Sequence, residues 1–383
     1  GARTAGVDGI APRSVGFGAG NLLSRIRAEL KAGSFGAQRV REKAIPKASG
    51  KIRRLGIPTT ADRVVQAALK LVLEPIFEAT FRPCSYGFRP KRRAQDAIAE
   101  AHFFCSRSYE WVLEGDIEAC FDEISHPALM WRVRHRIGDK RVLALVKAFL
   151  KAGILSEDGA YRDTVTGTPQ GGILSPLLSN VALSVLDDHF VGAWDKLSST
   201  SHAREKRRSK GLANYRFVRY ADDWVLLVAG ARADAEALRE EAAGVLQKMG
   251  LRLAEAKTRI SHMDEGFDFL GFRIQRHKKR GSDKRFVYTY PSKEALATIK
   301  AKVRALTRGS THLSLTVLIH RINPVVRGWT TFFRHGASKM TFKYLSAFLW
   351  RRVICWLRHK HPKISWKELL RLYLPGWWPT EGG

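Results

Sequence analysis

The chain has 383 residues, 45% of them hydrophobic, and carries 66 Lys and Arg against 36 Asp and Glu, a formal net charge of +30. This length predicts two or three subdomains, and so large an excess of positive charge favours a nucleic acid as partner over a merely basic surface. Four dispersed cysteines without a C-x-x-C pair argue against a zinc module or a disulfide scaffold and fit a reducing cytosol, and no apolar stretch is long enough to span a bilayer.

The first hundred residues combine basic loops with one clear helical pattern. In ADRVVQAALKLVLEPIFEATF, at 61–81, apolar residues recur three and four positions apart after Asp62. This spacing predicts an amphipathic helix.

Between residues 108 and 275, short β-rich runs alternate with helical segments. The runs are YEWVLEGDI, FVRYADDWVLLV and FDFLGFRI, and the clearest helical segment is ADAEALREEAAGVLQKM. This alternation predicts an α+β domain built on an antiparallel sheet. We expect the basic stretch AREKRRSKG, at 203–211, to be a solvated loop.

The tail is expected to be helical, and it carries most of the net charge. After a basic linker at 276–290, Ser292 is placed to cap a helix that runs to about Thr307. Further helices are expected in SLTVLIHRINPVVRGWTTFFR and TFKYLSAFLWRRVICWLRHK. Residues 273–383 hold 24 Lys and Arg against 4 Asp and Glu, a balance of +20.

Two adjacent acids in this basic chain suggest metal chemistry. Asp222 and Asp223 lie between two strand-forming runs, and Asp116 ends another β-rich run, YEWVLEGD. Hard divalent cations such as Mg²⁺ prefer carboxylate oxygens, and two such ions promote nucleotidyl transfer. On spacing alone, this interpretation and that of an ordinary hairpin tip are equally open.

A Gly- and Pro-rich stretch, TVTGTPQGGILSPLLSN at 164–180, lies between these acids along the chain. Gly171 and Gly172 have no Cβ, so we expect the backbone there to lie flat against a nucleotide or a template base. The order of the three elements is what favours a polymerase site, because none of them alone is specific.

The sequence resembles the reverse transcriptases and maturases encoded by bacterial group II introns, over nearly its whole length. The matching blocks are GVDGI, IPKASGKIRRLGIPTTADRVVQ, SYGFRP, DIEACFD, GTPQGGILSPLLSN, YADD, LAEAKT, FLGF and RGWTTFFRHG. The resemblance implies a right-hand polymerase with fingers at 1–107 and a palm at 108–275, followed by an all-α thumb or maturase domain at 291–383. No DNA-binding or nuclease extension is visible, and we expect the chain, which starts without Met, to be a fragment.

The resemblance implies a metal site and a nucleotide site. The expected ligands of two Mg²⁺ ions are Asp116, Asp222, Asp223 and the backbone carbonyl of Ile117. Glu118 and Asp122 lie nearby at positions that the family does not use for metal. Deoxynucleoside triphosphates are the expected substrates.

Further residues are implied to contact the incoming nucleotide. Phe121 takes the position of the aromatic gate that excludes a 2′-hydroxyl, with core packing as the alternative, and Gln170 that of a residue beside the nucleotide. The candidates to hold the triphosphate are Lys47, Arg53 and Arg54, with a solvated hairpin as the alternative. Lys257 is the candidate to protonate the leaving pyrophosphate, with a plain surface lysine as the alternative.

The maturase-like tail is expected to bind RNA. The residues expected to meet RNA phosphates are Arg327, Arg334, Lys339, Lys343, Arg351, Arg352, Arg358 and Lys360. Trp329 and Phe333 lie among them at helical spacing, and we expect them to pack in the domain core first.

The function implied is that of an RNA-directed DNA polymerase that binds its group II intron RNA, assists splicing and supports retrohoming by target-primed reverse transcription. Its partners would be the intron RNA, an RNA template and a DNA primer or target, in the bacterial cytoplasm and at the nucleoid during insertion, without a membrane. Two alternatives remain: a domesticated relative used in repair or with a CRISPR system, and an RNA-binding splicing cofactor without polymerase use. The intact acid triad weighs against the second.

Overall fold

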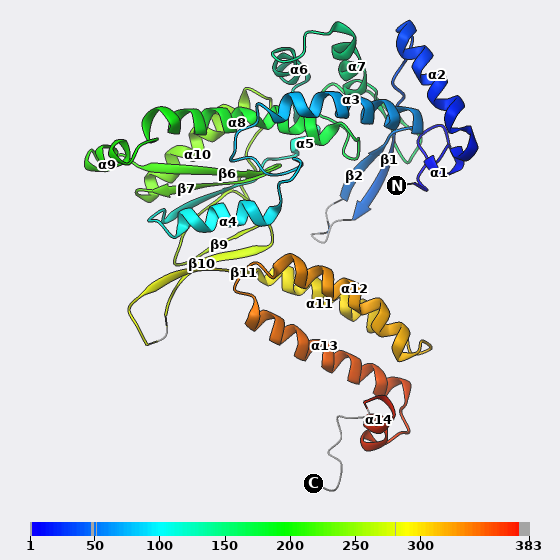
Figure 1. Cartoon of the computed structure of the whole chain (residues 1–383), viewed down its shortest axis with the longest axis vertical. Coiled ribbons are helices and arrows are strands. Elements are labelled where there is room, and N and C mark those ends of the chain that lie inside the picture. Colours follow the sequence, from blue (N-terminus) through cyan, green and yellow to red (C-terminus); the bar gives the residue numbers. More distant parts are fainter. Residues whose placement is uncertain (1, 47–49, 51, 280, 375–383) are drawn as a thin grey trace. The chain divides into compact units, whose positions relative to one another are not determined.

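The structure is a computed structural model that describes residues 2–46, 50, 52–279 and 281–374. Internal contacts divide the chain into two units, residues 1–262 and 263–383 (Figure 1). No helix within the described ranges is long and apolar enough to cross a bilayer.

The first unit contains helices and two sheets. Its helices are α1 (Pro12–Val15), the 3₁₀ turn η1 (Gly16–Gly18), α2 (Ala19–Ala32), α3 (Thr60–Glu78), α4 (Ala94–Cys105), α5 (Cys120–Glu123), α6 (His126–Arg134), α7 (Lys140–Leu150), α8 (Ser175–Leu197), α9 (Ser201–Ser209) and α10 (Arg232–Gln247). Its strands are β1 (Val40–Pro46), β2 (Ile52–Ile57), β3 (Trp111–Gly115), β4 (Ile154–Leu155), β5 (Tyr161–Arg162), β6 (Asn214–Tyr220), β7 (Asp223–Ala229) and β8 (Arg259–His262). The strand orders are β2-β1-β4-β5 and β6-β7-β3-β8.

Helix α3 confirms the amphipathic pattern read from the sequence. It begins after Thr59, whose hydroxyl oxygen accepts the backbone N–H of Asp62 at 3.1 Å, while the Asp62 carboxylate accepts the Thr59 hydroxyl at 2.7 Å. This reciprocal bonding satisfies a free N–H of the first turn. The apolar positions Val65, Leu69 and Leu73 are buried along one face of the helix.

The sheet β6-β7-β3-β8 is antiparallel throughout, as the α+β prediction required. Along β7, Trp224, Leu226 and Val228 pack into the main core with residues of α8 and α10. Val225 and Leu227 are also buried, and because strand residues alternate between faces they point to the opposite side. Helix α4 contacts β6 and β7 and lies on the other side of the sheet from α8 (Figure 1).

The basic stretch at 203–211 is not the solvated loop that the sequence suggested, because most of it forms helix α9. Thr200 caps the helix by accepting the N–H of Ala203 at 3.1 Å. Arg204 and Arg207 donate to backbone carbonyls on either side, Arg207 to that of Ala213 at 2.7 Å. A cap and these side-chain bonds hold the helix although it buries none of its residues.

In its described residues, the second unit contains a three-stranded sheet and four helices. Its elements are β9 (Phe267–Phe269), β10 (Phe272–Lys278), β11 (Arg285–Pro291), α11 (Lys293–Thr307), α12 (Leu315–Phe333), α13 (Lys339–Lys360) and α14 (Trp366–Tyr373), with the sheet order β11-β10-β9. Residues 276–278 and 285–290, expected to lie in a linker, instead belong to strands β10 and β11. Arg276 and Arg285 both bond to Asp264, which offsets part of the positive charge of these strands.

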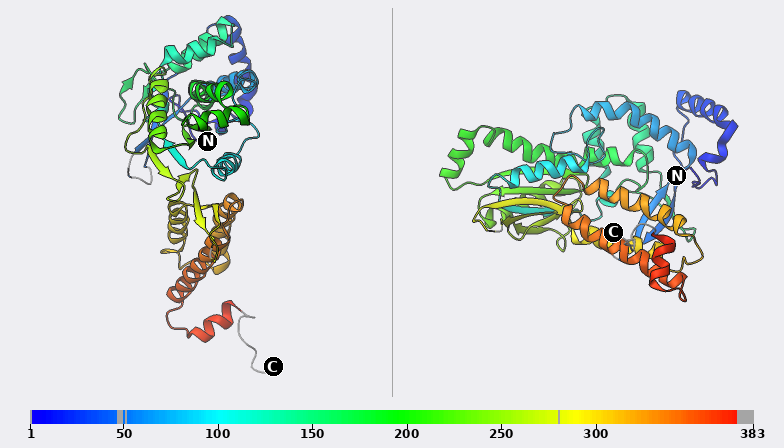
Figure 2. Two further views of the ribbon diagram at one scale, coloured as in Figure 1. Left: turned by 90° about the vertical axis from the view of Figure 1, so that its left-hand side faces the viewer. Right: turned by 60° about the horizontal axis from the view of Figure 1, so that its bottom comes forward.

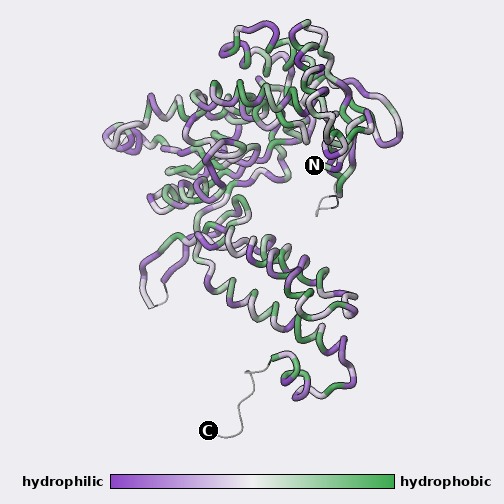
Figure 3. Tube along the Cα trace, turned by 45° about the vertical axis from the view of Figure 1, so that its right-hand side comes forward, coloured by the Kyte–Doolittle hydropathy of each residue, from purple (hydrophilic) through white to green (hydrophobic). Residues whose placement is uncertain are grey.

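The helices of the second unit follow the sequence closely. Ser292 caps α11 by accepting the N–H of Ala295 at 3.1 Å, and the helix ends at Thr307 as predicted. Helix α11 packs against both α12 and α13, as two further views show (Figure 2). Hydrophobic and hydrophilic residues alternate along these helices (Figure 3), and the buried Leu318 of α12 and Trp356 of α13 share one cluster.

Candidate active site

The three predicted metal-binding aspartates lie at one end of the sheet β6-β7-β3-β8. Ala221 and Asp222 form the two-residue turn between β6 and β7, and Asp223 is the first residue of β7. Strand β3 pairs with β7 as far as Gly115, which places the next residue, Asp116, beside Asp223. The fold therefore brings together carboxylates that lie far apart in the sequence.

Trp224, the residue after the aspartates, anchors β7 to β3. Its side chain is 1% exposed. Its ring lies so close to Gly115 that a Cβ on that glycine would be 2.0 Å from the indole. Phe217 packs on the same ring, with the centroids 5.6 Å apart. Gly115 thus provides the space in which the tryptophan holds the two strands together next to the aspartates.

Negative charge is concentrated at this edge of the sheet. Asp223 is exposed as a residue, but protein atoms around its carboxyl group reduce the hydration of the charged form. This burial, together with the charges of Asp222 and Asp116, raises its pKa to about 6. Lys257 acts in the opposite direction, and its Nζ lies 2.6 Å from a carboxylate oxygen of Asp116. Carboxylates that repel one another in this way are stabilised by a cation.

The donor set suits Mg²⁺, because carboxylate oxygens converge from β3 and from the β6–β7 turn. In the part of the chain that the structure describes, no three His, Cys, Asp or Glu side chains already form a metal-holding group. The residues that would hold the ion are Asp116, Asp222 and Asp223.

The hydrogen bonds on either side of Ile117 indicate the direction of its backbone carbonyl. Ile117 forms an isolated antiparallel bridge with Leu253, and the hydrogen bonds of this bridge come from the neighbours Asp116 and Glu118. In such a pair the central residue directs its own N–H and C=O away from the partner. The Ile117 carbonyl therefore points toward the side of β7, and its role as a metal ligand stays a prediction.

Lys257 is tied to the strand that carries Asp116 by backbone and by side chain. Its N–H closes a turn on the carbonyl of Ala254 at 3.0 Å, and Ala254 donates to the backbone carbonyl of Asp116 at 2.8 Å. The alternative of a plain surface lysine is therefore disfavoured. Its role as proton donor to pyrophosphate stays a prediction.

In the β1–β2 hairpin, Arg53 and Arg54 have different partners, although the sequence does not distinguish their roles. Arg53 donates from Nε to the side-chain oxygen of Gln170 at 3.1 Å. Arg54 bonds instead to Glu42 at 2.7 Å, and Arg162 contacts the same carboxylate at 2.6 Å. Glu42 is only 6% exposed. Arg53 therefore lies on the Gln170 side of the hairpin, whereas Arg54 helps to hold the sheet β2-β1-β4-β5.

Gln170 connects this hairpin to α5. Its amide nitrogen donates to Oδ2 of Asp122 at 3.1 Å, and its backbone carbonyl accepts the N–H of Gly56 at 2.7 Å. Asp122, an acid that the family pattern leaves without a metal role, thus helps to orient Gln170. Lys47, the third predicted triphosphate contact, lies outside the described residues.

The Gly-rich loop makes close contacts within the protein. Gly171 has φ +111°, and a Cβ there would lie 2.8 Å from the carbonyl oxygen of Gly56. A Cβ on Gly172 would lie 2.6 Å from Oγ of Ser175. The sequence predicts that these glycines make room for a nucleotide, but in the structure the space beside them is taken by β2 and by the start of α8.

Phe121 lies on α5, shortly after Asp116, and its side chain is half-buried. Its backbone carbonyl accepts the N–H of Thr168 at 2.6 Å, and a Cβ on Gly167 would lie 2.6 Å from the same oxygen. The loop at 167–172 is therefore packed directly on the backbone of Phe121. The role as a gate against a 2′-hydroxyl stays a prediction.

Of the eight cations predicted to meet RNA, these are exposed: Arg327, Arg334, Lys339, Lys343, Arg351 and Arg358. The other two are half-buried and bonded within the second unit, and their contact with RNA stays a prediction. Arg352 donates to Oγ1 of Thr307 at 2.7 and 3.1 Å, and Lys360 donates to the backbone carbonyls of Thr311 and Leu313 at 2.8 and 2.7 Å. These two side chains join α13 to the end of α11 and to the loop before α12.

The aromatic residues of the tail pack as predicted. Phe333 is buried, and the ring of Trp329 lies 4.6 Å from it between centroids. Phe272 of β10 contacts Phe333 at 4.7 Å. These rings join α12 to the small sheet of the second unit.

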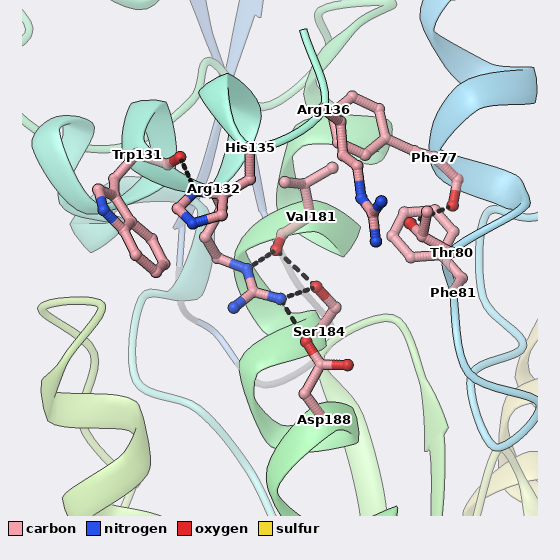
Figure 4. A pocket seen from close by; sticks show the side chains of 10 residues that line it. All are labelled: Phe77, Thr80, Phe81, Trp131, Arg132, His135, Arg136, Val181, Ser184 and Asp188. Carbon is pink, nitrogen blue, oxygen red and sulfur yellow. Dashed lines mark hydrogen bonds and ion pairs between the residues drawn. The ribbon is translucent and has the colours of Figure 1, made fainter. Parts of the chain in front are cut away.

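A cavity of about 210 Å³ opens elsewhere on the first unit, between the end of α3, helix α6 and helix α8 (Figure 4). Arg132 crosses it and donates to the carbonyl of Val181 at 2.9 Å, to Oγ of Ser184 at 2.7 Å and to Asp188 at 2.6 Å. The guanidinium and the carboxylate offset each other's charge. None of the three aspartates of the site lines this cavity.

The chain matches two family models. Residues 45–274 match the reverse transcriptase (RNA-dependent DNA polymerase) family, and residues 296–374 match the group II intron maturase-specific domain. The chain belongs to the group II intron reverse transcriptase and maturase family.

Relatives of known sequence agree with this membership. Protein YkfC of Escherichia coli is 38% identical over 313 residues, which cover 77% of this chain and 82% of YkfC. The group II intron-encoded protein LtrA of Lactococcus lactis is 34% identical over 310 residues, which cover 69% of this chain but only 51% of LtrA. This reverse transcriptase chain therefore spans about half the length of that relative.

A solved structure supports the fold. The telomerase from Candida albicans, in complex with a fragment of telomeric RNA, superposes with a TM-score of 0.51 and covers 92% of this chain and 64% of its own. The sequence identity is 12%, so this likeness concerns the fold alone.

Proposed function

We propose that this family member synthesises DNA on an RNA template by two-metal nucleotidyl transfer at Asp116, Asp222 and Asp223. The observation that carries the proposal is that these three carboxylates lie at one end of the sheet, where burial and the charges of Asp222 and Asp116 raise the pKa of Asp223. Family membership supplies the reaction class, and the donor set supports Mg²⁺ as the ion.

The residues around the aspartates support a division of roles. Asp116, Asp222 and Asp223 would hold Mg²⁺, which when bound would lower the pKa of the primer 3′-hydroxyl and offset the charge of the phosphates. Lys257 balances charge beside Asp116, and Arg53, whose Nε is bonded to Gln170, would bind the triphosphate through its terminal N–H groups. In the proposed reaction the 3′-hydroxyl would lose its proton to solvent, its oxygen would bond to the α-phosphorus, and the bond from that phosphorus to the bridging oxygen of the leaving pyrophosphate would break.

The test is primer extension on an RNA template. Asp223→Asn is expected to lower kcat by about 10³-fold, since the loss of one carboxylate weakens the hold on the metal ions. Asp163→Asn, which changes an exposed acid in the same unit, should keep kcat within twofold. Full activity of Asp223→Asn in Mg²⁺ would refute the proposed mechanism.

We infer further that the maturase-specific domain binds group II intron RNA through its exposed cations and thereby assists splicing, and that the same polymerase copies the intron at a DNA target. The excess of positive charge in residues 273–383 supports the first step, because phosphate contacts give affinity without a sharp motif. The double change Arg327→Glu and Lys343→Glu should weaken intron RNA binding at least tenfold at about 0.15 M salt.

A charge-matched control separates this from a general loss of positive charge. Lys147→Glu with Lys210→Glu changes two exposed cations of the first unit and produces the same net charge. If both double variants weaken RNA binding equally, the tail is not the binding surface.

A further inference from the structure

The turn that carries the aspartates has a backbone that its sequence does not favour. Ala221 has φ +56°, in the left-handed region where residues with a Cβ are disfavoured. It is the first of the two turn residues, a position that glycine usually takes when φ is positive. A conformation of this kind persists only where the surroundings hold it.

A buried guanidinium supplies part of that hold. Arg219, two residues before Ala221, is 0% exposed, and its Nη1 donates to the backbone carbonyl of Ala221 at 2.9 Å. Its other N–H groups reach Oδ1 of Asp187 at 2.7 Å, Oδ2 of Asp187 at 2.6 Å, Oδ1 of Asn180 at 3.0 Å and Oγ of Ser85 at 2.8 Å. All five N–H groups of the arginine are therefore used.

The segment at 84–87 clamps the same turn from a second direction. The N–H of Tyr86 donates to the carbonyl of Arg219 at 2.8 Å, and Asn180 donates to the carbonyl of Gly87 at 2.7 Å. Gly87 lies against the turn so closely that a Cβ there would be 2.2 Å from the backbone nitrogen of Ala221. The left-handed residue is thus held on one side by Arg219 and on the other by Gly87.

Breaking the ion pair between Arg219 and Asp187 would destabilise the protein, because it would leave one buried charge without a partner. The presence of the pair is nevertheless not explained by a gain in stability. Asp187 is also 0% exposed, and both of its oxygens accept from Arg219. A buried ion pair is seldom more stabilising than apolar residues of the same volume, because both charges lose their hydration. What apolar side chains could not supply is the bond from the guanidinium to the Ala221 carbonyl.

We propose that Arg219 and Asp187 are positioning residues that hold the Asp222–Asp223 turn in its metal-binding conformation. Asp187 orients the guanidinium, the guanidinium holds the carbonyl of Ala221, and the turn then presents its two carboxylates beside Asp116. The inference rests on the proposed two-metal function. Small displacements of groups that bind a reacting centre lower rates steeply, so the arrangement has a catalytic consequence.

Helix α8 offers a matched control one residue away. Asp188 follows Asp187, but its side chain is 48% exposed and bonds to Arg132 (Figure 4). It also bonds to Arg82. Asp187→Asn and Asp188→Asn make the same chemical change at adjacent positions, and each removes the charge of an aspartate that is paired with an arginine. Only Asp187 is connected to the turn.

Two milder variants guard against misfolding. Ser85→Ala removes one hydrogen bond of Arg219 without changing a charge. Arg219→Lys keeps the positive charge opposite Asp187, but an ammonium has three N–H groups and cannot reach all the acceptors that the guanidinium serves. If the pair served charge balance alone, Arg219→Lys would behave as the wild type.

The experiment measures three quantities on all four variants: primer extension on an RNA template, Mn²⁺ binding followed by electron paramagnetic resonance, and the affinity for the template–primer. We expect Asp187→Asn to lower kcat by about 10- to 100-fold and to weaken Mn²⁺ binding about tenfold. We expect several-fold losses of both in Ser85→Ala and Arg219→Lys, and changes within twofold in Asp188→Asn. The template–primer affinity should stay within twofold throughout.

The outcomes separate this proposal from the proposed function. If the wild type extends primers while Asp187→Asn, Ser85→Ala and Arg219→Lys match Asp188→Asn in kcat and Mn²⁺ affinity, the positioning role is wrong. If Asp187→Asn does not fold, Ser85→Ala and Arg219→Lys decide by the same criterion. If the wild type binds Mn²⁺ but extends no primer, the proposed function fails, and Mn²⁺ affinity alone decides the positioning role.

Discussion

The aspartate turn and the basic tail are both polar regions, but they are built in opposite ways. At the turn, Asp222 and Asp223 are placed by buried contacts from β3, α8 and the segment at 84–87. On the tail, the exposed cations of α12 and α13 extend from helix surfaces into solvent. The first arrangement fixes a geometry, and the second concentrates charge.

The two constructions suit two kinds of chemistry. A metal ion held by carboxylates needs ligand positions that do not drift, so each contact behind the turn affects all ligands together. Phosphate contacts along an RNA are largely independent, so each contributes a similar small amount to affinity. Single substitutions should therefore have large effects at the turn and graded effects on the tail.

The largest expected effect is the loss of Asp116. In Asp116→Asn the metal position loses a carboxylate, and Lys257, whose Nζ lies 2.6 Å from that carboxylate, is left without an opposite charge, so the site becomes more positive by one charge. We expect kcat for primer extension to fall by about 10³-fold or more, while intron RNA binding stays within twofold. A comparable loss of RNA affinity would contradict the separation of the two regions.

A second prediction concerns the packing behind the turn. In Gly115→Ala the new Cβ would lie 2.0 Å from the ring of Trp224, and a buried ring cannot easily yield. We expect the free energy of unfolding to fall by about 3 kcal/mol in urea titrations, from overpacking.

Gly244→Ala is the matched control for this overpacking. Gly244 lies within α10, where a Cβ would meet no atom of another element within 4 Å, so alanine should raise stability by about 0.5–1 kcal/mol through its helix propensity. Equal destabilisation by both changes would mean that the contact with Trp224 is not the cause.

The sequence was sufficient to predict the hairpin with Asp222 and Asp223 at its tip and the five helices α3, α10, α11, α12 and α13, because these signals are local. Ser292 caps α11 as predicted, and the YADD block lies at the hairpin tip. What it could not supply were partners distant along the chain. Arg219 bonds to Asp187, 32 residues away, and Arg162 to Glu42, 120 residues away. No periodicity relates such pairs.

A weaker signal for Arg219 was nevertheless present. It stands inside the strand-forming run FVRYADDWVLLV, on the same face as the buried Phe217, and Asp187 lies in a largely apolar part of α8. Charged residues at buried positions of a strand and a helix are rarely left unpaired. Their pairing could be anticipated in kind, whereas the bond to the Ala221 carbonyl needed the structure.

A third prediction compares neighbouring arginines in the β1–β2 hairpin. Arg53→Ala removes the donor to Gln170, and we expect the KM for the incoming nucleotide to rise about tenfold with little change in stability. Arg54→Ala removes one of two partners of the buried Glu42, so we expect a loss of stability below about 1 kcal/mol and an unchanged KM. If Arg54→Ala raised the KM and Arg53→Ala lowered stability, Arg54 would be the residue that binds the nucleotide and Arg53 the one that stabilises the hairpin.

The smallest expected effects come from adjacent arginines on the tail. Arg351 is exposed, so Arg351→Gln should weaken intron RNA binding severalfold and lower the slope of log affinity against log salt by about one, without changing stability. Arg352 donates to Thr307 of α11, so Arg352→Gln should lower the free energy of unfolding by about 1 kcal/mol and leave the salt slope unchanged. Salt titrations of RNA binding and urea titrations of both variants make the comparison. If Arg352→Gln lowers the salt slope as much as Arg351→Gln does, its guanidinium leaves Thr307 for a phosphate when RNA binds.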